Sequence, residues 1–161
     1  MADNASSKAF DYAAKNVIDL ARVEAGSVSK VKTFLSGLES DLVKILNDNK
    51  DLSPGKKAKL ETILKAAGSA IDSTYQAIGK QHAGDMAGLA KAQAAAAGKM
   101  LNHAIGVDVF GAVLTGSQLA SVAGDTAVFG HSSGDWWASQ SSQLRFKFAG
   151  QMKQGYALGE D

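Results

Sequence analysis

A heptad pattern in the first third of the chain most constrains how this sequence can fold. The pattern advances in alternating steps of four and three from Phe10 to Ile45, with Glu24 as its polar interruption. Such spacing lines up one face of a helix that pairs with another helix. Gly26 and Gly37 weaken a helix without shifting this phase, so the sequence predicts one long helix over 6–49. The residues that form this seam are Phe10, Ala14, Val17, Ala21, Glu24, Val28, Val31, Leu35, Leu38, Leu42 and Ile45.

A second helical pattern follows a polar turn. The segment NDNKDLSPGKK interrupts the first pattern, and Ser53 before Pro54 is typical of a helix start. The second pattern runs to Ile105, so the sequence predicts a helix over 54–105. Two helices of similar length joined by a short turn fold back as a long antiparallel helical hairpin, the first domain, 1–105. The apolar stripe of the second helix is Leu60, Leu64, Ala67, Ile71, Thr74, Ile78, His82, Met86 and Leu89.

Small residues dominate the far half of the second helix. Gly79, Gly84, Gly88 and the alanines at 94–97 permit close approach of another helix but bury little area. A dense core needs more side-chain volume than these residues supply. The sequence therefore predicts that another copy, or a symmetric partner protein, completes the hairpin as a homo-oligomer or ring.

The second domain, 106–161, is loop-rich and ends in a helix. Thr115 or Ser117 is a suitable N-cap for a short helix through Ala123, and a loop is predicted over 127–133. The whole chain is therefore predicted to be all-α.

The final helix, predicted over 136–158, is amphipathic and rich in aromatic residues. Asp135 is its predicted N-cap and Gly159 its C-terminal stop. Adjacent helical residues point about 100° apart, so one of Trp136 and Trp137 is expected to lie in the core and the other in a docking surface. Trp137 is predicted to pack and Trp136 to remain available to a partner. The packing stripe is Trp137, Leu144, Phe148 and Met152.

No arrangement of residues in the sequence indicates catalysis, a cofactor or a metal. The chain has no cysteine, and His82, His103 and His131 lack the paired spacing of metal ligands. His131 lies beside two serines and an aspartate, which suits helix capping better than a nucleophilic triad. Carboxylates such as Asp41, Glu61 and Asp72 are predicted to face solvent. The protein is therefore expected not to be an enzyme.

The basic and aromatic residues of the final helix permit three interpretations. They can form a packing surface, a protein interface, or a surface that contacts nucleic acid, in that order of preference. A net charge of +1 argues against a dedicated nucleic-acid binder. The most apolar run, AGLAKAQAAAAG, is too short and too alanine-rich for stable membrane insertion.

The last 45 or so residues resemble a known family. The stretch TGSQLASVAGDTAVFGHSSGDWWASQSSQLRFKFAGQMKQGYALGE is similar to the head-morphogenesis family of tailed phages, the Mu F-type minor head proteins. Those proteins carry a short helix, a loop with phenylalanine and glycine, a tryptophan, and a helix that ends in QGxxxGE. The family usually has proline where this chain has Val128, and its domain usually continues past the GE pair. The matching positions are Leu119, Val128, Phe129, Gly130, Trp136, Trp137, Leu144, Phe148, Gln154, Gly155, Gly159 and Glu160.

The resemblance implies a structural virion component. Such a protein associates with the portal inside the capsid and affects head assembly, DNA packaging or DNA ejection, after residing in the host cytoplasm during assembly. Two alternatives stay open: an internal protein that is ejected with the genome and acts at the host membrane, and a helical protein that contacts DNA. The residues predicted to bind a portal or other capsid protein are Trp136, Arg145, Lys147, Phe129 and Tyr156.

Overall fold

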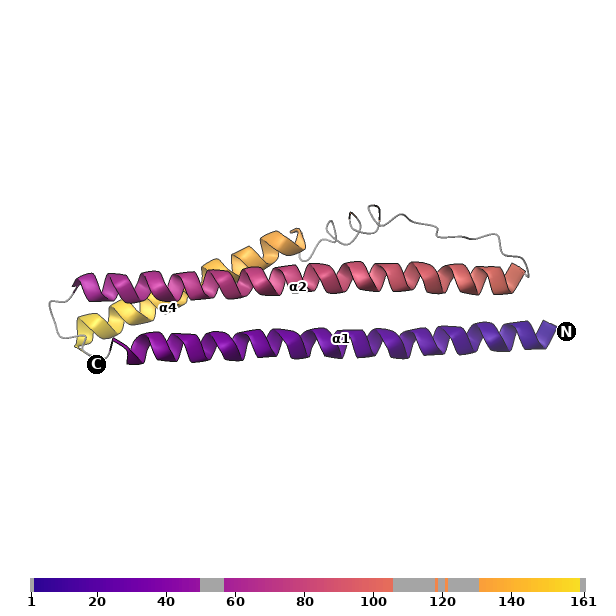
Figure 1. The fold of residues 1–161 in the computed structure, drawn as a ribbon, viewed down its shortest axis with the longest axis horizontal. Helices are drawn as coiled ribbons and strands as arrows, with labels where there is room; N and C mark the ends of the chain where they lie inside the picture. Colours follow the sequence, from indigo (N-terminus) through magenta and orange to yellow (C-terminus); the bar gives the residue numbers. More distant parts are fainter. Residues whose placement is uncertain (1, 50–56, 106–117, 119–120, 122–130, 160–161) are drawn as a thin grey trace. The chain divides into compact units, whose positions relative to one another are not determined.

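The computed structural model describes residues 2–49, 57–105, 118, 121 and 131–159. They form three helices, α1 (Ala2–Asn47), α2 (Lys57–Ile105) and α4 (Ser133–Leu158) (Figure 1). No β-strand occurs among these residues, which confirms the all-α prediction. The chain divides into two compact units, a first unit of 1–29 with 81–127 and a second unit of 30–80 with 128–161. Both long helices contribute to each unit, so these units differ from a division of the sequence at residue 105.

The helix boundaries agree with the sequence within a few residues where the structure describes them. α1 ends at Asn47, and the Asn49 side chain then donates a hydrogen bond of 2.8 Å to the Ile45 carbonyl. This contact satisfies a carbonyl that the helix end leaves without an intrahelical partner. The predicted start of α2 at Ser53 and Pro54 lies outside the described residues, as do most of the predicted short helix and loop.

Among the described residues, the buried hydrophobic side chains belong to the second unit. Within it, α1 and α2 run in opposite directions, as the hairpin prediction requires (Figure 1). Leu38 of α1 is only 4% exposed, so the heptad seam is buried there. The α2 residues recur at steps of three, four and seven, which places them on one face of the helix. The buried residues from α2 are Leu60, Ile63, Ala67, Ile71 and Ile78.

In the first unit, a hydrogen bond joins α1 to α2. Ser27 of α1 donates a hydrogen bond of 3.0 Å to the Asp85 carboxylate of α2, which also accepts one of 2.9 Å from Gln81. The seam is not buried in this unit, because Val17 is 64% and Val28 49% exposed. Ser27, which meets α2, points about 100° away from its neighbour Val28. α2 therefore does not bury the seam at Val17 and Val28.

Candidate functional site

The start of α4 is fixed by a serine cap. Ser132 precedes the helix with an extended backbone, and its Oγ accepts a hydrogen bond of 3.1 Å from the Asp135 backbone N–H. The same hydroxyl donates to the Asp135 carboxylate at 2.7 Å. The prediction of Asp135 as the N-cap is therefore wrong: the helix begins at Ser133, and Asp135 lies in its first turn, where a negative charge is favourable. The serine beside His131 thus caps a helix, as the sequence favoured.

Gly159 ends α4 as predicted. Its φ of 70° and ψ of 26° are left-handed, a conformation that glycine adopts without a steric penalty. Its N–H donates back to the carbonyls of Gly155 and Tyr156. Both ends of α4 are therefore capped, and the helix has a defined register.

One side of α4 packs against α2 through Trp137. The nearest Trp137 atom lies 3.6 Å from where a Cβ on Gly79 would stand, so the indole lies against bare α2 backbone. Its ring also lies 6.2 Å from the Tyr75 ring, between centroids, at a tilt of 50°. Gly79 was predicted to allow close approach of a helix, and here that helix is α4 of the same chain.

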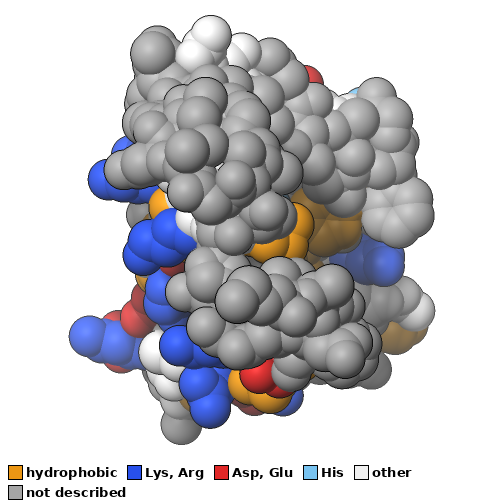
Figure 2. Space-filling view, turned by 90° about the vertical axis from the view of Figure 1, so that its right-hand side faces the viewer, with side chains coloured by type: hydrophobic (Ala, Val, Ile, Leu, Met, Phe, Trp, Pro, Cys, Tyr) orange, Lys and Arg blue, Asp and Glu red, His pale blue; other side chains and the backbone are white. Residues whose placement is uncertain are grey.

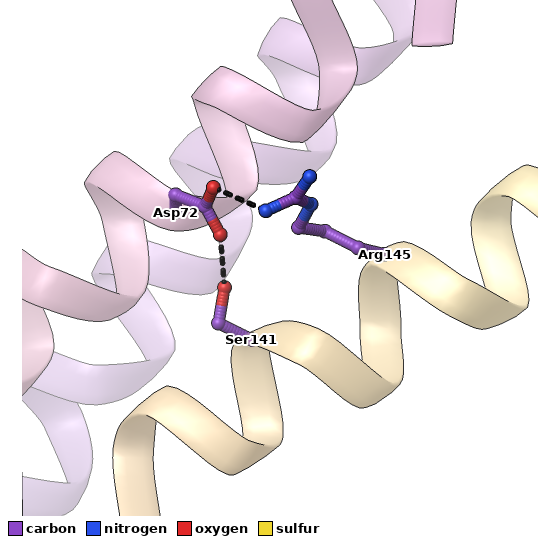
Figure 3. Close-up of polar contacts among 3 residues, drawn as sticks. All are labelled: Asp72, Ser141 and Arg145. Carbon is purple, nitrogen blue, oxygen red and sulfur yellow. Dashed lines mark hydrogen bonds and ion pairs between the residues drawn. The ribbon is translucent and has the colours of Figure 1, made fainter. Parts of the chain in front are cut away.

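A polar contact joins the same two helices one to two turns further along (Figure 3). The Asp72 carboxylate of α2 accepts hydrogen bonds of 2.7 Å from both Ser141 Oγ and Arg145 Nη1. Ser141 is buried, whereas Asp72 and Arg145 are partly exposed. Because Ser141 and Arg145 occupy consecutive turns of α4, one carboxylate can receive both. Asp72 therefore holds α4 in place.

These contacts set the direction and register of α4. Along α2 the contact residues rise from Gly68 to Asp72 to Gly79, while their α4 partners fall from Arg145 to Ser141 to Trp137. The two helices are therefore antiparallel. The face of α2 that meets α4 recurs at helical spacing and consists of Gly68, Asp72, Tyr75 and Gly79.

The contact corrects one sequence prediction and changes the interpretation of another. Asp72 was expected to face solvent for solubility, but its carboxylate joins two helices. Arg145 was predicted to bind a partner, but its guanidinium is paired with Asp72. Ser141 was missed, although it stands four residues after Trp137 on the predicted packing stripe. A hydroxyl in an apolar stripe was the signal for a buried polar partner.

The opposite side of α4 carries an exposed aromatic residue. Phe146 is 81% exposed, the highest value among the large hydrophobic side chains that the structure describes. Lys147 beside it is also exposed. A groove of about 350 Å³ lies between α2 and α4 next to Phe146. Its lining residues are Leu64, Gly68, Ile71, Ser142, Arg145, Phe146, Phe148 and Ala149.

The remaining predicted residues differ in how far they are exposed. Trp136 is half-buried and packs edge-on against Trp137, with ring centroids 4.5 Å apart. Tyr156 is half-buried near the end of α4, and Phe129 lies outside the described residues. Of the described residues that were predicted to bind a partner, Lys147 is charged and exposed, and Arg145 is charged and partly exposed. Phe146 belongs to the aromatic residues off the packing stripe for which a protein interface was one interpretation, but it was not among the five residues predicted to bind a partner.

The described residues show no arrangement suited to metal chemistry. No group of three or more His, Asp or Glu side chains lies close enough together there to hold a metal ion. His82 is half-buried on α2 and His131 is exposed, so those two do not share a site.

Among the described residues on the face drawn in Figure 2, positive charge is mixed with negative charge and apolar groups. Figure 2 shows blue Lys and Arg side chains on one face, with red Asp and Glu side chains and orange hydrophobic side chains among them. A surface that follows a phosphate backbone requires a more uniform excess of cations. None of the helices that the structure describes is both long enough and apolar enough to cross a bilayer.

Comparison with protein-family models, with curated proteins and with solved structures finds no match for this chain.

Proposed function

We propose that this protein is a non-catalytic structural component of a tailed-phage head, a minor head protein that binds the portal protein inside the capsid. The single observation that carries the binding part of this proposal is Phe146, 81% exposed on a helix that is capped at both ends. Covering this side chain with a partner would remove its apolar surface from water, which is favourable.

The way α4 is held supports a role in docking. Trp137, Ser141 and Arg145 fix the inner side of α4 to α2, so the outward side is presented on a rigid element. A preorganised surface loses less conformational entropy on binding than a flexible one. Phe146 with Lys147 beside it is the combination of an apolar anchor and a polar rim that protein interfaces use.

The phage assignment is supported by the resemblance of the C-terminal residues. The residues that carry it include Trp137, which packs against Gly79 of α2, and Gly159, which ends α4. The resemblance therefore concerns the element that presents Phe146. The partner that it implies is the portal, in the head interior.

A binding experiment tests this proposal. The portal protein of the same phage is mixed with the wild-type chain, with Phe146→Ala and with Val43→Ala, which removes an exposed side chain of α1 instead. We expect Phe146→Ala to weaken portal binding by about tenfold or more, as truncating a hot-spot aromatic does, and Val43→Ala to leave it unchanged. Equal binding by all three proteins would contradict the assignment of the α4 surface.

Protein binding is favoured over DNA binding on this surface. Arg145, the one arginine of α4, donates to Asp72, so part of its charge is neutralised within the molecule. A DNA-binding surface would lose affinity steeply as salt rises, because counterions are released from the phosphates. We expect weak DNA binding at low salt that Phe146→Ala does not alter.

A further inference from the structure

Arg145 uses only part of its guanidinium to hold α4. Its Nη1 donates to the Asp72 carboxylate at 2.7 Å, and the guanidinium makes no other hydrogen bond or ion pair among the described residues. Nε and Nη2 together form the fork with which an arginine binds both oxygens of one carboxylate. Figure 3 shows the second terminal nitrogen turned away from Asp72. The side chain is 51% exposed, which leaves room for an outside acceptor at this fork.

Gly68 of α2 lets the guanidinium lie flat against the helix. A Cβ on Gly68 would stand 3.4 Å from Nε of Arg145, 3.7 Å from Cζ and 3.7 Å from Nη2. A group in front of the fork would be clearly closer to the two nitrogens than to the carbon that joins them. The nearly equal distances therefore place Gly68 against the flat side of the guanidinium, so it does not cover the edge that carries the N–H donors.

The same guanidinium lines the groove between α2 and α4. The volume of this groove, about 350 Å³, is at the lower end of the range for sites that bind small ligands. Apart from Arg145 and Ser142 its walls are apolar. Hydrogen bonds beside apolar walls are stronger than in water, because the local dielectric constant is lower. The other lining residues are Leu64, Gly68, Ile71, Phe146, Phe148 and Ala149.

The charge of α4 favours an acidic ligand in this groove. After its first turn α4 carries Arg145, Lys147 and Lys153 and no acidic residue. Asp72 neutralises part of the charge of Arg145, whereas both lysines are exposed. This part of α4 therefore keeps a net positive charge, which attracts a carboxylate and repels a cation.

We propose that the groove binds an acidic segment of the partner protein. An Asp or Glu carboxylate of that segment pairs with the Nε–Nη2 fork of Arg145, and a neighbouring apolar side chain fills the groove against Phe146. A carboxylate alone would leave the apolar walls uncovered, and an apolar group alone would leave the fork without an acceptor. The proposal rests on the portal-binding function for the identity of the partner, and it adds the chemistry that the partner presents.

A small molecule that combines both chemical features tests the groove without the portal protein. The chain contains two arginines, Arg22 and Arg145, so isotopic labelling of arginine nitrogen gives two Nε–H signals in an NMR spectrum of the full chain. The signal that disappears in Arg145→Lys belongs to Arg145. The ligand is hydrocinnamate, a phenyl ring on a short carboxylate chain, and its uncharged amide is the control ligand.

We expect hydrocinnamate to shift the Arg145 signal with a dissociation constant on the order of millimolar, as suits so small a ligand. Arg22, which is exposed on α1 beside Asp19, should not respond, and the amide should shift neither signal. An Arg145 signal that stays unchanged up to about 10 mM hydrocinnamate would overturn the proposal. Equal shifts of both arginines, or equal shifts by the acid and its amide, would also overturn it.

Binding to the portal protein tests whether the carboxylate belongs to that partner. Arg145→Lys keeps the positive charge and a donor for Asp72 but loses the planar fork. We expect this variant to bind the portal about tenfold or more weakly than the wild type, and Arg22→Lys, the same substitution on α1, to bind it normally. Normal binding by Arg145→Lys, with the loss expected for Phe146→Ala, would overturn the carboxylate contact and leave the portal assignment intact. A hydrocinnamate response with unchanged portal binding by both variants would support the ligand chemistry of the groove and contradict only the portal assignment.

Discussion

At the scale of single residues, Asp72 holds α4 to α2. Its carboxylate accepts from Ser141 and from Arg145 at 2.7 Å each. Asp72 and Arg145 are both partly exposed, so water and salt screen the ion pair. The bond from buried Ser141 is shielded better, and losing it leaves a buried hydroxyl unsatisfied. The contribution of Asp72 therefore comes from two unequal contacts.

Asp72→Ala removes both contacts and should lower the free energy of unfolding by about 1–2 kcal/mol. Arg145→Ala removes only the screened ion pair and should lower it by less than about 1 kcal/mol. The exposed Asp41 provides the matched control, since Asp41→Ala should change stability little. Urea unfolding of the three variants measures the differences, and equal effects of Asp72→Ala and Asp41→Ala would contradict the role of Asp72.

The aromatic residues of α4 should differ in the same experiment. Trp137 packs on Gly79 and Tyr75, and most of its large side chain is covered. Trp137→Ala should therefore lower the free energy of unfolding by about 2–3 kcal/mol. Phe146→Ala should leave stability nearly unchanged, because that side chain is already in water. A larger loss of stability for Phe146→Ala than for Trp137→Ala would contradict the assignment of Trp137 to the packed side of α4 and Phe146 to the exposed side.

At the scale of elements, local sequence patterns predict where the helices lie. They do not predict how the helices pack against one another. Heptad spacing, the Gly159 stop and the stripe that contains Trp137 give α1, α2 and the end of α4 close to their observed bounds. The hydrogen bond between Asp72 and Ser141 could not be predicted. The two residues lie 69 positions apart in the sequence, and the bond depends on which faces of α2 and α4 pack together. The Ser132 cap was missed because Asp135 is an equally good capping residue by type.

The close approach of α4 to α2 at Gly79 gives an element-scale prediction. A methyl group there would stand 3.6 Å from the indole of Trp137, an ordinary contact distance, so Gly79→Ala should be tolerated and should gain helix propensity. Gly79→Leu needs space that Trp137 occupies and should displace α4 from α2. Fluorescence of the two tryptophans reports this displacement. Gly37→Leu serves as the control, since no atom lies within 4 Å there, and it should leave the emission unchanged.

At the scale of the whole molecule, burial is uneven between the two units. All the buried hydrophobic side chains among the described residues belong to the second unit, whereas Val17 and Val28 of the first unit are exposed. Of the heptad seam, Leu38 is buried in the second unit, whereas the α2 residues of the first unit are mainly small and polar and leave Val17 and Val28 exposed.

Two leucines of one helix test this unevenness within the second unit. Leu38 is 4% exposed and Leu35 is 39% exposed on the same seam. Leu38→Asp buries a charge without a partner and should unfold the second unit, whereas Leu35→Asp should leave the protein folded. Circular dichroism melting distinguishes the two outcomes, and equal melting temperatures would contradict the assignment of the core.

The central claim is that the outward side of α4 docks on the portal, and site-specific photo-crosslinking in assembled heads tests it most directly. A photoreactive phenylalanine analogue is placed at position 146, or at position 43 as the exposed control. We predict that illumination joins position 146 to the portal protein and that position 43 gives no such product. Cross-links from position 146 to DNA alone, or equal portal products from both positions, would contradict the account.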